Sequence, residues 1–291
     1  MIGSSTIISH TGPATALKLA RVRPSRARGQ NFLVQASVAA QIVDAAEVSA
    51  NDTVVEIGPG LGILTERIVD AGPGRLILVE IDTRLASILS ARFDSDSRVE
   101  ILHRDFLAVT RSELGGERLK IIANLPFSTA AAILQHLCNY RDSITRMVLM
   151  FQREVAERIR AVPGSRNYSA LSVFSSLYWS VIAHFRVAGG SFHPRPKVDA
   201  GVLIMEPRVP LDFDGAEEAA VLATVRAAFA APRKTIRNSL AAGLRLNTLQ
   251  IEAALESANI DSSTRPGMLD RSQLIALARI LRPSAAAPHR A

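Results

Sequence analysis

The amino-acid sequence predicts an α/β fold, with a doubly wound and mostly parallel sheet, followed by a smaller C-terminal all-α domain. Short apolar runs rich in Val, Ile and Leu alternate with segments of helical periodicity through the first half of the chain. The composition then changes to alanine-rich helical segments from about residue 209. The chain has 291 residues, 48% of them hydrophobic and 21% charged, which suffices for one large and one small domain.

The first predicted elements are a helix, which begins at residue 37, and the first strand of the sheet with the turn and helix that follow it. A helix is expected over residues 37–47, with Ser37 as its N-cap and apolar residues along one face. The β-branched run 53–57 then predicts a strand that ends in the glycine turn 58–62, and residues 63–69 return to helical spacing. A strand, a glycine turn and a helix thus follow one another without a linker.

Four further strands continue this alternation. They are expected at residues 75–79, 99–103, 119–123 and 147–151, with a helix at 85–93 after the first of them. Right-handed crossovers place the carboxyl ends of parallel strands at one edge of the sheet, where ligands bind. Helices at 217–230, 249–258 and 271–281 are expected to form the small domain.

These elements divide the chain into four parts. We expect a basic N-terminal arm at 1–28, a large ligand-binding domain at 29–208, a helical domain at 209–282 and a disordered Pro/Ala-rich tail at 283–291. The arm carries Lys18, Arg21, Arg23, Arg26 and Arg28 and no acid. It lacks the compact apolar block that export requires, although an organellar transit peptide remains an alternative.

Composition excludes several classes of protein. No apolar run approaches the roughly 20 residues that a membrane-spanning helix needs, so a soluble protein is expected. The single cysteine, Cys138, cannot form an internal disulfide, which fits a reducing cytoplasm, and no Cys/His cluster has the spacing of a metal site. The net charge of +7 favours a polyanionic partner, although charge alone also fits an ordinary basic protein.

The glycine turn is the first candidate ligand site. Gly58, Gly60 and Gly62 would let the backbone approach a ligand that a Cβ atom would block. Dinucleotide-binding enzymes use the spacing G-x-G-x-x-G, whereas this turn has G-x-G-x-G after the acidic Glu56. A tight turn without a ligand remains an alternative interpretation.

Acidic residues follow the next two strands. Glu80 ends the strand at 75–79, where a carboxylate can accept hydrogen bonds from both ribose hydroxyls of an adenosine-containing ligand. Asp105 follows the strand at 99–103 and could accept from an adenine amino group while Phe106 packs against the ring. Either acid alone also fits a helix N-cap, but their positions at successive strand ends favour a nucleoside site.

The end of the fourth strand discriminates between ligand classes, because the chain there reads Asn124-Leu125-Pro126-Phe127. The adenine amino nitrogen is a poor nucleophile, since its lone pair is delocalised into the ring. Acceptors such as the Asn124 side-chain oxygen and the Leu125 carbonyl can pull it toward a reactive, pyramidal geometry. Pro126 stiffens the loop, and Phe127 offers a face on which a flipped-out base can stack. Taken alone, the tetrapeptide also fits an ordinary loop with a buried Phe.

Together these segments resemble a known family, the ribosomal RNA adenine-N6 dimethyltransferases. The family includes small-subunit (16S) enzymes and large-subunit (23S) methylases that confer macrolide resistance. The resembling segments are Gly29-Gln30-Asn31-Phe32-Leu33, Val55-Glu56-Ile57-Gly58-Pro59-Gly60-Leu61-Gly62, Val79-Glu80-Ile81-Asp82, Asp105-Phe106 and Asn124-Leu125-Pro126-Phe127.

The resemblance implies a Rossmann-like class I methyltransferase fold and S-adenosylmethionine as the cofactor, bound by the domain at 29–208. The residues that would contact the cofactor are Asn31, Leu33, Gly58, Gly60, Glu80, Ile81, Asp105, Phe106 and Asn124. The catalytic loop would consist of Asn124, Leu125, Pro126 and Phe127, with Asn124 facing the target adenine. No metal is expected.

Three further segments, 152–158, 191–199 and 233–240, resemble the small-subunit enzymes, so the resemblance covers residues 26–281. Their cations are candidates for contacts to RNA phosphates, and those at 233–237 recur at helical spacing. These candidates are Arg153, Arg158, Arg195, Lys197, Arg233, Lys234 and Arg237. The implied activity is mono- or dimethylation of adenine N6 in 16S ribosomal RNA during ribosome biogenesis, by a cytoplasmic monomer that acts on a small-subunit particle.

The chain departs from the small-subunit enzymes at two places. These enzymes usually carry Tyr followed by Asn-Ile in the catalytic loop, where this chain has Phe127-Ser128-Thr129, a change that retains stacking. Gly189-Gly190 replaces a Pro-rich approach to the loop at 191–199, which predicts a more flexible loop. Three alternatives remain: a large-subunit adenine methylase of the macrolide-resistance type, a non-catalytic RNA-binding assembly factor and a nicotinamide-dependent oxidoreductase.

Overall fold

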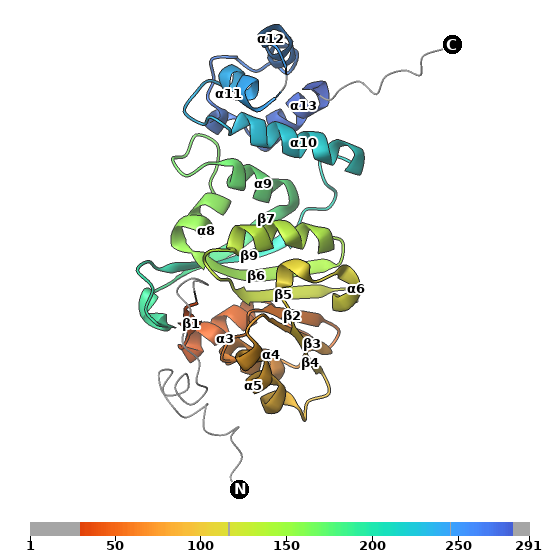
Figure 1. Cartoon of the computed structure of the whole chain (residues 1–291), viewed down its shortest axis with the longest axis vertical. Helices are drawn as coiled ribbons and strands as arrows, with labels where there is room; N and C mark the ends of the chain where they lie inside the picture. The colour runs from red at the N-terminus through yellow and green to blue at the C-terminus, as the bar shows by residue number, and fades with distance from the viewer. Residues whose placement is uncertain (1–29, 116, 245, 282–291) are drawn as a thin grey trace, which may run out of the picture. The chain divides into compact units, whose positions relative to one another are not determined.

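The computed structural model describes residues 30–115, 117–244 and 246–281 (Figure 1). The basic arm and the tail expected from the sequence therefore lie outside the described residues. Contacts within the chain divide it into two compact units. The first contains the residues up to Ala156 together with Ser180–Pro207, and the second contains Glu157–Trp179 together with the residues from Arg208 onward.

A seven-stranded sheet forms the centre of the first unit (Figure 1). Its strands lie in the order β4-β3-β2-β5-β6-β9-β7. They are β2 Thr53–Ile57, β3 Arg75–Glu80, β4 Val99–His103, β5 Leu119–Asn124, β6 Ile144–Gln152, β7 Trp179–Val187 and β9 Ala200–Pro207. A separate antiparallel ladder pairs β1, Phe32–Leu33, with β8, Phe192–His193.

Strands β2 to β6 form the parallel part of the sheet. β2 pairs in parallel with β3 and β5, β3 pairs with β4, and β5 pairs with β6. The register sets Ile57 beside both Val79 and Ala123, and Glu80 beside His103. The carboxyl ends of these strands therefore meet at one edge of the sheet. This arrangement confirms the α/β class that the sequence predicts.

The parallel strands are buried on both faces. Val54 and Val55, which point to opposite faces of β2, both have no exposed surface. Ile42, Ile68 and Leu89 from three helices pack with Val54 in one apolar core cluster. The helices of this unit are α3 Ala36–Ala45, α4 Ile63–Asp70, α5 Thr83–Phe93, α6 Arg111–Leu114 and α7 Ala130–His136, and α8 Arg153–Ile159 spans the boundary between the units.

The sequence-based prediction missed β7 and β9. β9 pairs antiparallel with β6, from Met147 beside Met205 to Gln152 beside Ala200. β9 follows β8 without a helix between them and so lies outside the strand-helix alternation that identified the others. Edge strand β7 exposes 49% of Ile182, so its apolar pattern is incomplete. The N-cap of α3 is also a correction, because Gln35 and not Ser37 takes that position.

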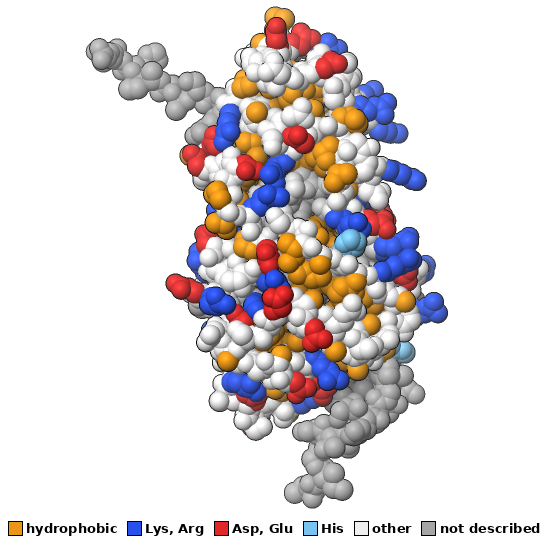
Figure 2. All heavy atoms as spheres, turned by 180° about the vertical axis from the view of Figure 1, so that it is seen from behind, with side chains coloured by type: hydrophobic (Ala, Val, Ile, Leu, Met, Phe, Trp, Pro, Cys, Tyr) orange, Lys and Arg blue, Asp and Glu red, His pale blue; other side chains and the backbone are white. Residues whose placement is uncertain are grey.

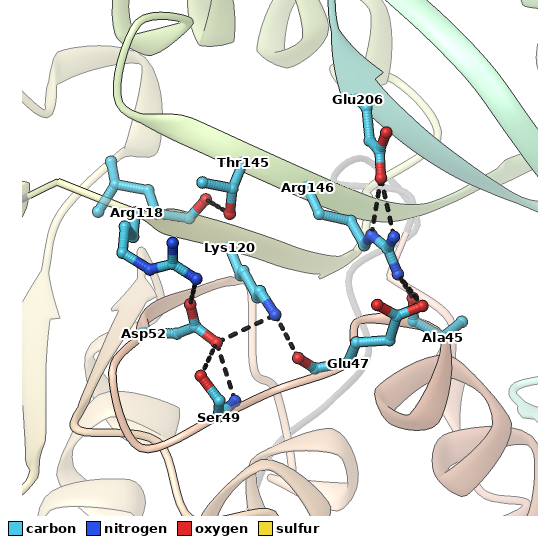
Figure 3. Close-up of polar contacts among 10 residues, drawn as sticks. Ala45, Glu47, Ser49, Asp52, Arg118, Lys120, Thr145, Arg146 and Glu206 are labelled. Atoms are coloured by element: carbon cyan, nitrogen blue, oxygen red, sulfur yellow. Dashed lines mark hydrogen bonds and ion pairs between the residues drawn. The ribbon is translucent and has the colours of Figure 1, made fainter.

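A polar network lies near the amino ends of β5 and β6, whereas ligands are expected at the carboxyl ends. Its contacts are drawn in Figure 3. The Lys120 ammonium lies 3.0 Å from the Asp52 carboxylate, which also accepts hydrogen bonds from the hydroxyl and N–H of Ser49. Burial raises the pKa of Asp52, but the hydrogen bonds from Ser49 and Lys120 outweigh burial and hold the pKa below its usual value. Arg146 of β6 pairs with Glu47 in the same network.

Helices make up most of the second unit. They are α9 Ala170–Tyr178, α10 Gly215–Ala228, α11 Ile236–Gly243, α12 Thr248–Ser257 and α13 Arg271–Leu281. α10 contacts α9, α11 and α13, and the Tyr178 hydroxyl donates to Glu218 at 2.7 Å. The guanidinium groups of Arg208 and Arg271 both donate to the carbonyl of Ser176 at 2.9 Å.

The boundaries between the two compact units differ from the domain boundaries that the sequence predicts. Residues Glu157–Trp179 group with the C-terminal helices, whereas the prediction kept them in the domain at 29–208. The reason is that α9 is joined in sequence to the sheet strands but contacts α10 and α13.

Among the described residues, no helix combines the length and the apolar content needed to cross a membrane.

Candidate functional site

A cavity of about 290 Å³ lies at the carboxyl ends of β2, β3 and β5. Its lining comes from five separate segments of the chain, so the fold rather than proximity in sequence assembles it. Every residue that the sequence assigns to catalysis or to the cofactor lines this cavity: Asn31, Leu33, Gly58, Gly60, Glu80, Ile81, Asp105, Phe106, Asn124, Leu125, Pro126 and Phe127.

The glycine turn between β2 and α4 forms one wall of the cavity. The Gly58 N–H donates to the Val79 carbonyl at 2.9 Å, which ties the turn to the end of β3. Gly60 has a φ of +59°, and a Cβ atom there would lie 3.0 Å from the Phe32 ring. A larger residue at position 60 would therefore be strained and would displace Phe32.

Glu80 is buried at the end of β3, with 3% of its surface exposed. Its Oε2 accepts from the Gly60 N–H at 3.1 Å and its Oε1 accepts from the Asp82 N–H at 2.9 Å. Burial raises the pKa of this carboxyl, while the N–H groups of Asp82 and Gly60 oppose that rise. An ionised carboxylate has about four acceptor positions, so further donors can bind it.

A second buried carboxyl, Glu56, lies on β2 two residues before Gly58. The Thr65 hydroxyl donates to its Oε2 at 2.6 Å, and Oε1 has no hydrogen-bond partner in the part of the chain that the structure describes. Burial raises the pKa of Glu56 to about 8, with a smaller contribution from the nearby Glu80. At pH 7 Glu56 is therefore mostly neutral and adds little negative charge beside Glu80.

Asp105 and Phe106 lie after β4. Asp105 accepts from the Leu107 N–H at 3.0 Å and is thus the N-cap of the short helix η1, Phe106–Ala108, while it also lines the cavity. The Phe106 ring meets the His136 ring edge-on, with 5.5 Å between the centroids, and lies 6.1 Å from the Tyr140 ring. Two aromatic side chains therefore hold Phe106 in the cavity wall.

Asn124 ends β5 and contacts the N-terminal segment of the described chain. Its Nδ2 donates to the Asn31 carbonyl at 3.0 Å. This bond sets the orientation of the amide, and no described residue donates to the acceptor oxygen Oδ1 at its other end. The oxygen that the sequence assigns to the target base therefore remains available within the cavity.

The rest of the catalytic loop is held by backbone hydrogen bonds. The Leu125 N–H donates to the Met150 carbonyl at 3.2 Å, which extends the pairing of β5 with β6. The Pro126 carbonyl accepts from the N–H groups of Thr129 and Ala130, both at 3.1 Å, and so forms the turn into α7. Phe127 lies in this turn, partly exposed at the cavity.

The segment before α3 links the cavity to the loop at 191–199. β1 pairs with β8, and the Val34 N–H donates to the Ser191 carbonyl at 2.9 Å. The Ser191 hydroxyl donates to the side-chain oxygen of Gln35 at 2.7 Å. Asn31, Phe32 and Leu33 are therefore attached on one side to the catalytic loop and on the other to a loop that carries candidate RNA-binding cations.

Arg195 and Lys197 are exposed in that loop, between β8 and β9. No described acidic residue pairs with either cation. Asp199 holds the end of the loop, because it accepts from the Gly189 N–H at 2.9 Å and from the Arg186 guanidinium at 2.6 Å, bonds that lower its pKa. The Gly189 N–H is therefore hydrogen-bonded, and the flexibility that two consecutive glycines predict for this loop stays a prediction.

Arg233, Lys234 and Arg237 do not form the single helical stripe that their spacing predicts. Arg233 and Lys234 are exposed in a turn, because α11 begins only after its N-cap, Thr235. Arg237 lies in α11 and pairs with Glu252 of α12 at 2.8 Å. The remaining two candidates, Arg153 and Arg158, both lie on α8 but fall in different units.

Charges of both signs are spread over the face of the molecule that Figure 2 shows. On the face shown in Figure 2, Lys and Arg side chains stand in small groups among Asp and Glu side chains rather than in one continuous patch.

Within the described ranges, no three His, Cys, Asp or Glu side chains come together as they would around a metal ion.

The cavity also contains residues to which the sequence analysis assigns no role. Phe32 covers the glycine turn, and Arg104 lines the cavity next to Asp105 while pairing with Glu113. Phe32 could have been found, because it stands inside the segment 29–33 that resembles the family. Arg104 carries only a weak signal, namely its place immediately before Asp105.

The topology and the site together define a class of protein. The last strand, β9, is inserted antiparallel between β6 and β7, whereas a dinucleotide-binding sheet continues with its sixth strand at that edge. The site adds a glycine turn after the first parallel strand and a carboxylate after the second. Together with the topology, these features define a Rossmann-like class I methyltransferase. This topology removes the nicotinamide-dependent oxidoreductase from the alternatives.

The chain belongs to the ribosomal RNA adenine dimethylase family, whose model matches residues 23–278. A ribosomal RNA small subunit methyltransferase A from Geobacter metallireducens is 39% identical over 265 residues, which cover 89% of this chain and 96% of that protein. The protein of the same name from Moorella thermoacetica is 38% identical over 282 residues, which cover 92% and 97%. The family that the sequence motifs indicate is thereby confirmed.

Solved structures share this fold. A dimethyladenosine transferase from Plasmodium falciparum is 24% identical and matches with a TM-score of 0.71, covering 84% of this chain and 95% of that chain. The 23S rRNA methyltransferase ErmE is 25% identical and matches with a TM-score of 0.65, covering 86% and 99%. Both are methyltransferases of similar architecture, which confirms the predicted fold class.

Proposed function

We propose that this protein transfers methyl groups from S-adenosylmethionine to the N6 amino group of adenines in 16S ribosomal RNA, in the cytoplasm and during assembly of the small subunit. The main support for this proposal is that the loop beginning at Asn124 lines the same cavity as Glu80 and the glycine turn. A nucleoside site and a loop suited to an adenine amino group thus share one space.

The residues present fit an adenosine-containing cofactor. Glu80 has acceptor positions for ribose hydroxyls, and Asp105 stands at the next strand end for a purine amino group. Ile81 is apolar yet 50% exposed, and with Phe106 it offers a surface for a purine ring. When bound, the cofactor supplies a methyl group on a sulfonium that is already an activated donor. The protein therefore has to bind and orient its substrates rather than activate the donor.

Asn124 and Leu125 act on the target base. Acceptors on the two N–H groups of the adenine amino nitrogen favour its pyramidal, nucleophilic geometry, and the Asn124 Oδ1 and the Leu125 carbonyl are such acceptors. The bond from Asn124 Nδ2 to the Asn31 carbonyl fixes the direction of that oxygen in advance. The nitrogen becomes acidic as it gains the methyl group, so its proton passes to water without a strong base.

Phe127 and Pro126 hold the base in place. Phe127 supplies a ring on which a flipped-out purine stacks, and Pro126 limits the conformations of the loop. The hydrogen bonds from Thr129 and Ala130 to the Pro126 carbonyl keep the turn closed. Phe127 in place of Tyr retains the stacking face, so this departure is compatible with the proposed activity.

The cations of two loops are proposed to bind the RNA backbone. Arg195 and Lys197 are exposed on the loop attached to the cavity wall, and Arg233 with Lys234 forms a second exposed pair before α11. None of these four has an acidic partner among the described residues, so each can pair with a phosphate without first breaking an ion pair. Arg237 is a weaker candidate because Glu252 already neutralises it.

The choice of small-subunit RNA is supported by the degree of similarity. Proteins named small subunit methyltransferase A are 38% and 39% identical to this chain, whereas ErmE, named for 23S rRNA, is 25% identical. A large-subunit methylase is therefore the weaker alternative. A non-catalytic assembly factor would leave the preset Asn124 amide and the buried Glu80 without a role.

The test compares two RNA substrates directly. The protein is incubated with labelled S-adenosylmethionine and either unmodified small-subunit particles or naked large-subunit RNA, and the modified nucleotides are mapped by mass spectrometry. We expect label on N6 of adenines in the small-subunit RNA. Label confined to the large-subunit RNA would favour the large-subunit alternative, and RNA binding without label would favour the assembly factor.

A further inference from the structure

Arg92, on α5, is a mostly buried cation with no role in the site described above. Its side chain is 11% exposed. The guanidinium donates to the Leu61 carbonyl at 3.1 Å and pairs with Glu66 on α4. Leu61 belongs to the glycine turn and lines the cavity, whereas Arg92 itself does not. One side chain thus joins α5, the glycine turn and α4.

The chemistry of arginine explains this arrangement. A backbone carbonyl in a tight turn needs a donor, because the turn offers it no place in a helix or sheet. Arginine carries several donors on a rigid planar group, so it can serve the Leu61 carbonyl and the Glu66 carboxylate at once. Glu66 lies in the first turn of α4, where the helix dipole favours a negative charge.

The third glycine of the turn is explained by Arg92 rather than by a ligand. Gly62 does not line the cavity. It has a φ of +81°, and a Cβ atom there would lie 3.1 Å from Nη1 of Arg92 and 3.2 Å from Leu89. Gly62 therefore allows both the left-handed backbone at the N-cap of α4 and the close approach of the guanidinium.

We propose that Arg92 is a positioning residue that holds the glycine turn in its ligand-binding shape and so sets the affinity for the adenosine-containing cofactor. It acts through the Leu61 carbonyl and touches neither the cofactor nor the reacting atoms. The inference rests on the proposed function, because it presumes that the cofactor lies against this turn.

The test is calorimetric titration of the full chain with S-adenosylhomocysteine. Removing one charge-assisted hydrogen bond from the turn predicts a rise in Kd of about tenfold for Arg92→Ala. Arg92→Lys is expected to give a smaller rise, because an ammonium is a compact charge that serves the two partners less well. In turnover assays the KM for S-adenosylmethionine should rise, while kcat at saturating cofactor stays unchanged.

Arg75 offers a matched control. It pairs with Glu100 at 2.5 Å and donates to the Leu114 carbonyl at 3.0 Å, and it does not line the cavity. Arg75→Ala therefore removes the same kinds of bond and should lower the Tm without changing the Kd for S-adenosylhomocysteine.

The possible results separate this inference from the proposed function. An unchanged Kd in Arg92→Ala, or equal rises in Arg92→Ala and Arg75→Ala, would overturn the role of Arg92 alone. If Arg92→Ala does not fold, Arg92→Lys decides in the same way, with an unchanged Kd counting against the inference. A wild-type protein that does not bind S-adenosylhomocysteine would overturn both the inference and the proposed cofactor.

Discussion

The Glu80 carboxylate accepts a hydrogen bond from the Gly60 N–H at 3.1 Å across 20 residues of sequence. This bond joins the end of β3 to the glycine turn after β2. It orients the carboxylate, because one oxygen is held by the turn and the other by the Asp82 N–H. Two features that are separate motifs in the sequence are thus one structural unit in the cavity wall.

Replacing Glu80 tests the cofactor site. Two hydrogen bonds from ribose hydroxyls to a buried carboxylate predict that Glu80→Ala raises the Kd for S-adenosylhomocysteine about 100-fold, while RNA affinity stays unchanged. Calorimetry measures the first and filter binding the second. Glu100→Ala, which removes a surface carboxylate, is the control. Equal cofactor affinity in wild type and Glu80→Ala would remove Glu80 from the site.

The raised pKa of Glu80 adds a pH dependence to this prediction. Burial raises the pKa of the carboxyl, and the ionised form is the better acceptor for ribose hydroxyls. As pH falls through this raised pKa the carboxyl takes up a proton, so cofactor affinity should be constant at high pH and should begin to fall at a higher pH than an ordinary glutamate would give. Glu80→Gln should flatten the profile, and a wild-type profile that rises toward low pH would contradict the assignment.

Phe127 is predicted to act by stacking. Phe127→Tyr should remain active because the ring face is retained, whereas Phe127→Ala should weaken productive binding of the base by roughly 1–3 kcal/mol. Single-turnover rates at increasing RNA concentration measure this difference as a higher half-saturation point for Phe127→Ala. Identical half-saturation for the Ala and Tyr variants would show that the ring does not stack on the base.

The exposed cations predict the salt dependence of RNA binding. Changing Arg195, Lys197, Arg233 and Lys234 to Gln should lower the log–log slope of affinity against salt by about 0.7–0.9 per lost phosphate contact. Arg237→Gln should change the slope less than any of these, since Glu252 pairs with Arg237. Titrations at several salt concentrations give the slopes. An unchanged slope in the fourfold variant would mean that these cations are solvated surface charges.

The parallel part of the fold was predictable because its signals are local. β2 is a short run in which every residue except Glu56 is β-branched, and it stops at a glycine turn. β5 is a mostly apolar run that ends at Asn124, just before Pro126. Parallel pairing then places all their carboxyl ends at one edge, so residues after successive strands meet in one cavity. For this reason the candidate site follows from strand ends together with the family resemblance.

Contacts between distant elements could not be predicted in this way. The bond from Arg92 to Leu61 crosses 31 residues, and nothing in the local pattern of α5 distinguishes Arg92 from a solvated surface arginine. The turn at Arg233 and Lys234 is a similar case, because helical spacing does not reveal that α11 begins only after Thr235. Strand β9 has an apolar run at residues 202–205, but it follows β8 without a helix between them, so the strand-helix alternation does not identify it.

We expect Asn124 to act in the chemical step of adenine methylation, and single-turnover methyl transfer by Asn124→Ala measures that step. With RNA shown to be bound and cofactor saturating, losing a preset acceptor predicts a rate about 10²–10³ lower than wild type, with little change in RNA affinity. Asn51→Ala, in an exposed turn before β2, should keep the wild-type rate. A near-wild-type rate for Asn124→Ala would contradict a role of Asn124 in methyl transfer and favour an RNA-binding assembly factor.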